Sequence, residues 1–111
     1  MDYVFEKKWQ DLLIRIEKDF GMPADVQGIL FLIGVQELGL GFGKFKKDEK
    51  LNLMHIAICR LLEPYGYYKF EGTDGEGWPH YEATKKLPSL SSSQQQQLIK
   101  EAILEYFEVE S

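Results

Sequence analysis

Three groups of residues have side chains and spacings that could support chemistry. The first is the glycine-rich segment 39–44, where successive backbone amides and a lysine ahead of a helix could hold a phosphate. A nucleotide-binding loop needs glycine, four residues and then Gly-Lys-Ser/Thr. Leu38 stands where the first glycine should be, and Phe45 stands where the hydroxyl should be. The segment therefore favours helix termination followed by a connector.

The second group is His55, Cys59 and Glu63, which recur every four residues and would share one face of a helix. This spacing suits metal ligands, or a thiol paired with a base. A structural zinc site requires four nitrogen or sulfur ligands, and the chain has one cysteine and two histidines, the other being His80. Because apolar neighbours would bury the thiol, we expect Cys59 to be inert and predict no metal or other cofactor.

The third group is a concentration of aromatic residues before and within a predicted hairpin. Its members are Tyr65, Tyr67, Tyr68, Phe70, Trp78 and Tyr81. Tyr and Trp bury large areas while keeping a polar atom available, so exposed clusters of them often bind partners. Packing of the hairpin against its own core is the alternative. We take Tyr67, Trp78 and His80 as the candidate interaction or ligand surface, and we expect Trp78 and His80 to face outward.

Glu37 and His55 are weaker polar candidates. Together with His80 they could form a small-ligand or enzyme site between the hairpin and the helices. Such a site requires His55 or His80 within hydrogen-bond reach of Glu37, at the wall of an open pocket. Because the sequence contains no recognisable catalytic motif, it favours a protein without catalysis and leaves an enzyme as an alternative.

These residues must be positioned by helices, which the hydrophobic periodicity predicts. Apolar residues at steps of three and four indicate a helix over about 2–20, ended by Gly21 and followed by Pro23. Residues 24–38 are apolar on nearly every side, which is typical of a helix at a domain centre or in an oligomer interface. A buried strand over 29–35 is the alternative, because the same run is rich in strand-forming residues.

The second half of the chain predicts two more helices and a hairpin between them. The helices cover about 48–62 and 92–107, and strands over about 67–71 and 78–85 flank a glycine-rich turn. An isolated two-stranded hairpin is marginal in water, so one of its faces should pack on the helices. The predicted fold class is mainly α, within α+β, in a single domain over 1–111.

Charge and hydropathy limit the classes of partner. The formal net charge of -5 discourages binding to nucleic acid or to an acidic membrane surface, since phosphate binding needs clustered Lys and Arg. The longest apolar stretch, residues 28–35, is too short to cross a bilayer. The first residues lack the pattern of a secretory signal, and a single cysteine gives no reason for an oxidising compartment. We therefore expect a cytoplasmic protein.

The order helix, helix, helix, hairpin over 24–87 resembles a winged helix-turn-helix domain, and Tyr-Glu-Ala-Thr-Lys-Lys-Leu at 81–87 is similar to the closing wing strand of some such regulators. This resemblance implies a nucleic-acid-binding regulator. The connector over 39–47 is longer than the usual three or four residues. Asp74 and Glu76 at the wing tip have the wrong sign for DNA, so DNA binding is disfavoured.

Three stretches resemble those of short bacterial proteins with no assigned function: Phe-Leu-Ile-Gly-Val-Gln-Glu-Leu-Gly at 31–39, Leu-Met-His-Ile-Ala at 53–57 and Gly-Trp-Pro-His-Tyr at 77–81. The resemblance implies no activity, site or cofactor. We therefore predict a protein-interaction domain that binds a protein partner or associates with itself. A homodimer would bury the apolar helix at 24–38. The nucleic-acid-binding regulator and the small-ligand or enzyme site remain as alternatives.

Overall fold

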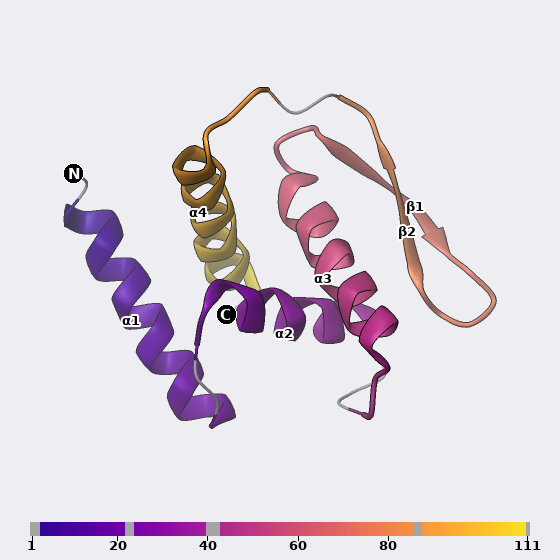
Figure 1. Cartoon of the computed structure of the whole chain (residues 1–111), viewed down its shortest axis with the longest axis horizontal. Coiled ribbons are helices and arrows are strands. Elements are labelled where there is room, and N and C mark those ends of the chain that lie inside the picture. Colours follow the sequence, from indigo (N-terminus) through magenta and orange to yellow (C-terminus); the bar gives the residue numbers. More distant parts are fainter. Residues whose placement is uncertain (1–2, 22–23, 40–42, 86–87, 111) are drawn as a thin grey trace.

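The computed structural model describes residues 3–21, 24–39, 43–85 and 88–110. Its helices and strands follow in the order α1 (Tyr3–Phe20), α2 (Val26–Leu38), α3 (Lys47–Leu62), β1 (Tyr68–Thr73), β2 (Pro79–Ala83) and α4 (Ser92–Glu110) (Figure 1). The predicted fold class, mainly helical with one antiparallel hairpin, is confirmed. Within the described residues, no helix combines the length and the apolar character that a membrane span requires.

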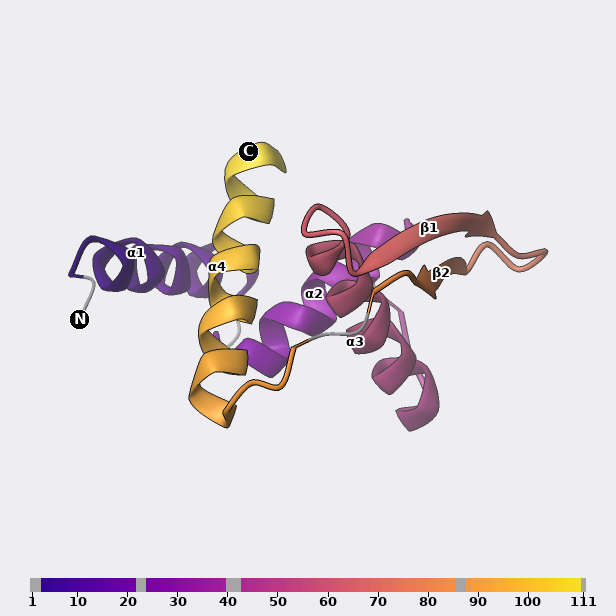
Figure 2. The same ribbon diagram turned by 90° about the horizontal axis from the view of Figure 1, so that it is seen from above.

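The helices and the hairpin are spread along the long axis of the molecule. α1 and the hairpin lie at opposite ends, with α4, α2 and α3 between them (Figures 1 and 2). α1 buries Trp9, Leu12 and Ile16 on one stripe and packs on α4. It ends as predicted at Gly21, whose φ of 65° is easily adopted only by glycine. Pro23, the predicted restart signal, lies outside the described residues.

α2 is the central helix of the fold, and residues 29–35 are helical rather than a strand. The side chain of Asp25 caps it by accepting the backbone N–H of Gly28 at 2.6 Å, and Gly39 ends it in the left-handed conformation. The rest of the candidate phosphate loop, residues 40–42, lies outside the described part of the chain.

α2 is buried from two sides by its own chain. Ile29 and Ile33 are 0% exposed in the larger core cluster, which α1, α3 and α4 complete. Val35 and Leu38 belong to a second cluster together with Leu53 of α3. The burial that this apolar helix requires is therefore provided within one chain.

α2 and α3 approach each other closely at Gly34. A β-carbon at this position would lie 2.7 Å from the carbonyl carbon of Leu53 and 2.9 Å from its Cβ atom. Both distances are shorter than van der Waals contact, so only glycine fits while the helices keep this separation. The close approach places α3, and with it the hairpin, against the centre of the domain.

The hairpin packs on α3 through one of its faces. Tyr68 pairs with Ala83 and Phe70 with Tyr81, so these four side chains share a face, as their alternation predicts. An irregularity between Phe70 and Gly72 shifts the register by one residue. Because of this shift, Gly72 pairs with His80 and Thr73 pairs with Pro79 next to the turn.

Candidate functional site

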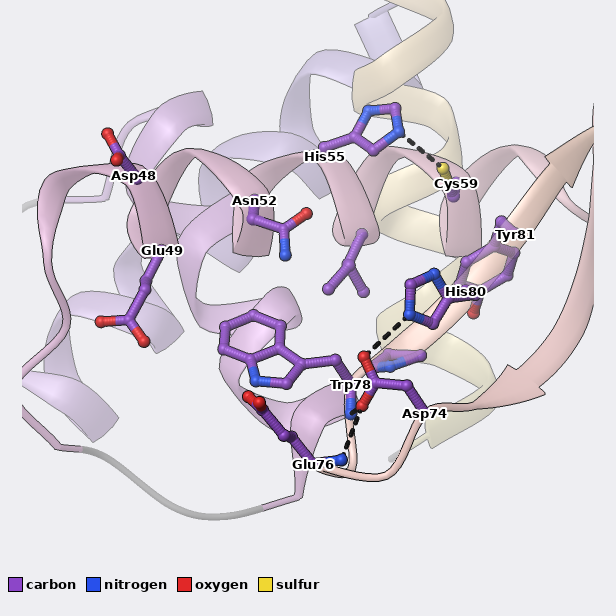
Figure 3. Close-up of a pocket in the computed structure, with 12 residues that line it drawn as sticks. Asp48, Glu49, Asn52, His55, Cys59, Asp74, Glu76, Trp78, His80 and Tyr81 are labelled. Atoms are coloured by element: carbon purple, nitrogen blue, oxygen red, sulfur yellow. Dashed lines mark hydrogen bonds and ion pairs between the residues drawn. The ribbon is translucent and has the colours of Figure 1, made fainter.

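A groove of about 460 Å³ lies between α3 and the hairpin (Figure 3). Its volume is within the range of about 300–1,000 Å³ that is typical of ligand-binding clefts. One helical face of α3 supplies Asp48, Glu49, Asn52, His55, Ile56 and Cys59. The hairpin supplies Asp74, Glu76, Trp78, Pro79, His80 and Tyr81. The groove therefore joins two segments that are far apart in sequence and brings together three predicted candidates: His55, Trp78 and His80.

Trp78 is half-buried, so the expectation that it faces outward is wrong. Its side chain packs against the second core cluster, which contains Val35, Leu38 and Leu53. Trp78 directly precedes the first residue of β2, so the alternation of strand side chains does not fix its direction. The part of its surface that stays accessible lines the groove. His80, in contrast, is exposed over 60% of its side chain, as expected.

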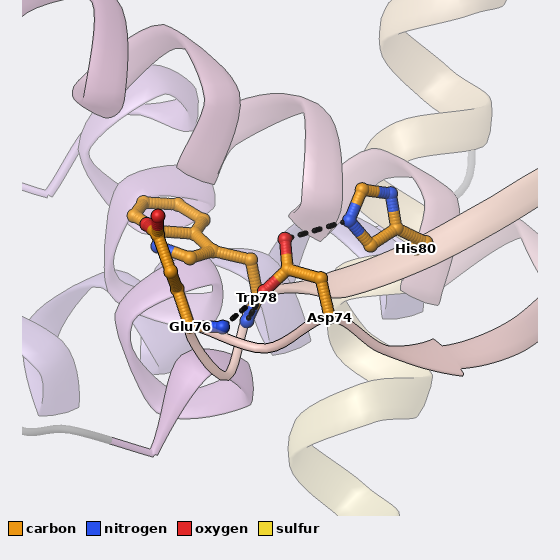
Figure 4. A network of polar contacts seen from close by, with 4 residues as sticks. All are labelled: Asp74, Glu76, Trp78 and His80. Atoms are coloured by element: carbon orange, nitrogen blue, oxygen red, sulfur yellow. Dashed lines mark hydrogen bonds and ion pairs between the residues drawn. The ribbon is translucent and has the colours of Figure 1, made fainter.

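The turn of the hairpin is organised by Asp74 (Figure 4). Its Oδ1 atom accepts the backbone N–H groups of Glu76 at 2.9 Å and Trp78 at 3.0 Å. Its Oδ2 atom lies 2.9 Å from Nε2 of His80. The hydrogen bond with His80, followed by the backbone bond from Trp78, lowers the pKa of Asp74 below its ordinary value. One carboxylate thus positions both Trp78 and His80 at the groove.

The groove is acidic. Four of its lining residues carry carboxylates, and no described lysine or arginine lines it. Glu49 is oriented by its helix, since its Oε1 atom accepts the backbone N–H of Lys46 at 2.8 Å. The carboxylates of Asp48 and Glu76, unlike that of Glu49, have no hydrogen-bond or ion-pair partner among the described residues. Two carboxylates of the groove are therefore available to a ligand.

His55 and Cys59 are in contact, with 3.5 Å between Nε2 and Sγ. Cys59 is only 1% exposed, and this burial raises the pKa of its thiol to about 11. At neutral pH the thiol is protonated, which agrees with the predicted inert cysteine. Glu63 does not join the pair, because its Oε2 atom accepts the backbone N–H of Phe70 at 3.0 Å. In the described part of the chain, no group of three or more residues is arranged to hold a metal ion.

Glu37 lies away from the groove, in a contact that joins three helices. Its Oε1 atom is 3.4 Å from Nε of Arg60 on α3, and its Oε2 atom accepts the hydroxyl of Tyr106 on α4 at 2.8 Å. The guanidinium of Arg60 also lies 5.2 Å from the ring centroid of Tyr106. The histidine–Glu37 contact that an enzyme site requires is therefore not formed by the described residues.

Tyr67, the remaining candidate, also lies outside the groove lining. The ammonium of Lys85 is 4.7 Å from its ring centroid, a contact between residues that flank the open end of the hairpin. The residue is half-buried.

Five polar residues of the groove were not predicted as site residues: Asp48, Glu49, Asn52, Asp74 and Glu76. A signal for part of this set exists in the sequence. Asp48, Asn52 and His55 are spaced by four and three residues, so they extend the helical face on which His55 lies. No local pattern indicates that the turn containing Asp74 lies opposite that face.

Comparison of the chain with protein-family models, with curated proteins and with solved structures finds no match. The geometry and charge of the groove are therefore the features that indicate a function.

Proposed function

We propose that this protein is a protein-interaction module, and that its groove between α3 and the hairpin binds a segment of a partner protein containing lysine or arginine. The observation that carries the proposal is the charge of the groove, which has four carboxylates and no described basic residue. An ammonium or guanidinium group entering it would be close to several carboxylates at once.

Trp78 supports the same class of partner. Its indole is held by the second core cluster and borders the groove, so little conformational entropy is lost when a ligand contacts it. A cation over an indole face gains about 0.5–1 kcal/mol at an exposed site and more where water is excluded. A lysine or arginine side chain could contact this aromatic surface and the neighbouring carboxylates together.

The charge of the groove opposes the nucleic-acid alternative. Phosphate groups would be repelled by Asp48, Glu49 and Glu76, which lie on both sides of the groove. Two features of a catalytic site are not found at the groove. The thiol of Cys59 is protonated at neutral pH, so it is a poor nucleophile. Glu37, the partner that a catalytic histidine would need, instead contacts Arg60 outside the groove. These observations favour binding without catalysis.

The test measures binding of fluorescently labelled peptides by anisotropy. The probe is an acetylated and amidated decapeptide of alternating Lys and Thr, and the control peptide has Glu in place of Lys. We expect saturable binding of the Lys peptide alone, weakening as salt rises because exposed charges are screened.

A pair of double variants separates the groove from the net charge of the chain. Asp48→Asn with Glu76→Gln removes the two available groove carboxylates. Asp19→Asn with Glu101→Gln removes the same charge from exposed positions on α1 and α4 that do not line the groove. The first variant should lose about tenfold in affinity, since each charged contact contributes up to about 1 kcal/mol. Absence of saturable binding, or equal losses in both variants, would refute the proposal.

A further inference from the structure

The outer edge of β2 borders the groove. Three consecutive residues, Pro79, His80 and Tyr81, line it. Side chains of a strand point alternately to its two faces, so consecutive residues line one cavity when the edge of the strand faces that cavity. A smaller cavity of about 300 Å³ gives the contrast, because it takes only Pro79 and Tyr81 from β2. Pro79 and Tyr81 point to the same face of β2, so the smaller cavity lies against a face of the hairpin. The groove lies against the outer edge of β2.

The backbone N–H and C=O groups of Tyr81 lie on this outer edge of β2. The N–H of Thr84 donates to the carbonyl of Tyr67 at 3.0 Å, which marks that pair as one with inward backbone groups. In an antiparallel ladder such pairs alternate with pairs whose N–H and C=O groups point outward. The next pair after Tyr67 and Thr84, Tyr68 with Ala83, is therefore an outward pair. The pair two residues further along, Phe70 with Tyr81, is outward as well. The N–H and C=O groups of Tyr81 and Ala83 therefore point away from β1.

The two edges of the hairpin differ in how they are occupied. On the β1 side, the outward N–H of Phe70 donates to the carboxylate of Glu63, the residue that caps the end of α3, at 3.0 Å, so this donor of the edge is occupied. On the β2 side, no partner for the outward N–H of Tyr81 is found among the described residues. Unpaired backbone groups along an edge form a template for another strand.

We propose that the partner segment binds as an extended strand that pairs with the outer edge of β2 and forms a third strand of the sheet in the groove. This inference rests on the proposed function, because it describes how the same basic segment is held. Main-chain hydrogen bonds from such strand addition provide affinity, and alternate side chains provide specificity.

The geometry limits the length and pattern of that segment. Pro79 has no N–H, so the outward donors of β2 are those of Tyr81 and Ala83. The added strand would present every second side chain to α3, where Asp48 and Glu49 lie, and the others to solvent. We therefore infer a short segment in which lysine or arginine occupies alternate positions.

The test uses the alternating Lys-Thr decapeptide and two N-methylated versions. One version carries backbone N-methyl groups on every Lys, and the other carries them on every Thr. All Lys amides of a strand point to one edge and all Thr amides to the other, so only one version blocks the ladder. We expect one version to lose about tenfold or more in affinity and the other to stay close to the parent.

These measurements distinguish failure of the proposed function from failure of the strand addition. If the unmethylated peptide does not bind, the proposed function is wrong. If it binds and both methylated versions behave alike, the strand addition is wrong and the groove binds the segment in another conformation.

Amide hydrogen exchange gives a second readout that does not depend on modified peptides. Saturating peptide should slow exchange of the Tyr81 and Ala83 amides, while the amide of Lys69, which lies on an inward pair, changes little. Unchanged exchange at Tyr81 would overturn the inference. Light scattering completes the test: a dimer that Ala83→Pro abolishes would make a second copy of this chain the occupant and overturn a separate partner.

Discussion

Replacing Gly34 by alanine tests the contact that places α3 and the hairpin against the rest of the protein. The new β-carbon would lie 2.7 Å from the carbonyl carbon of Leu53, which belongs to a helical backbone and cannot rotate away. Overpacking of this kind costs about 3 kcal/mol at the upper end of its usual range. Alanine is favoured over glycine in a helix by about 1 kcal/mol. The net expectation is a loss of about 2 kcal/mol of unfolding free energy.

Thermal and urea unfolding followed by circular dichroism measure this loss. For a domain of this size, about 2 kcal/mol corresponds to a fall of about 8 °C in Tm. Gly75→Ala is the control, because a β-carbon there meets nothing within 4 Å and its φ is not positive. The control should change the unfolding free energy by less than about 0.5 kcal/mol. If Gly34→Ala raises Tm, the propensity gain dominates and the close packing of α2 on α3 is refuted.

Three further predictions concern the side chains of Tyr106, Cys59 and Asp74. Tyr106→Phe should cost about 1–2 kcal/mol in urea unfolding, because it removes the hydroxyl that donates to Glu37; an unchanged midpoint and slope would contradict this. Cys59 should resist a disulfide reagent at pH 8 in the native protein, since a pKa of about 11 leaves about one thiol in a thousand ionised, and a fast stoichiometric reaction would show the thiol to be accessible. Because folding lowers the pKa of Asp74, its stabilising contribution is present above the unfolded pKa, near 3.8, and is lost as pH falls through the folded value. Stability curves of wild type and Asp74→Asn should therefore differ at pH 7, begin to converge below about pH 4 and meet below the folded pKa of Asp74; parallel curves would exclude this role.

The helices could be predicted from the sequence because each has a local signal. The period of Trp9, Leu12 and Ile16 marks the buried stripe of α1, and Gly21 marks its end. α2 was the ambiguous case, since a run apolar on all sides fits a helix or a buried strand. Its helical state is determined by packing from both sides, which includes the contact at Gly34.

The candidate site was predicted only in part, because its two walls meet through tertiary structure. His55 and His80 were identified by their chemistry and do line the groove. Trp78 was identified, but with the wrong orientation, since its direction is fixed by Asp74 and by the core cluster beneath it. Glu37 was assigned to the site, yet its partners are on α3 and α4, which the local sequence does not reveal.

A residue-resolved binding map decides whether the groove holds a basic segment: the full chain is labelled with ¹⁵N and titrated with the alternating Lys-Thr decapeptide. Binding in the groove predicts saturable shifts at the backbone amides of Asn52 and Tyr81 and at the indole N–H of Trp78, which lie around the groove. It predicts no comparable shifts at Glu101 and Glu105 of α4, an acidic surface outside the groove. Shifts centred on α4, or no saturable shifts at all, would contradict it.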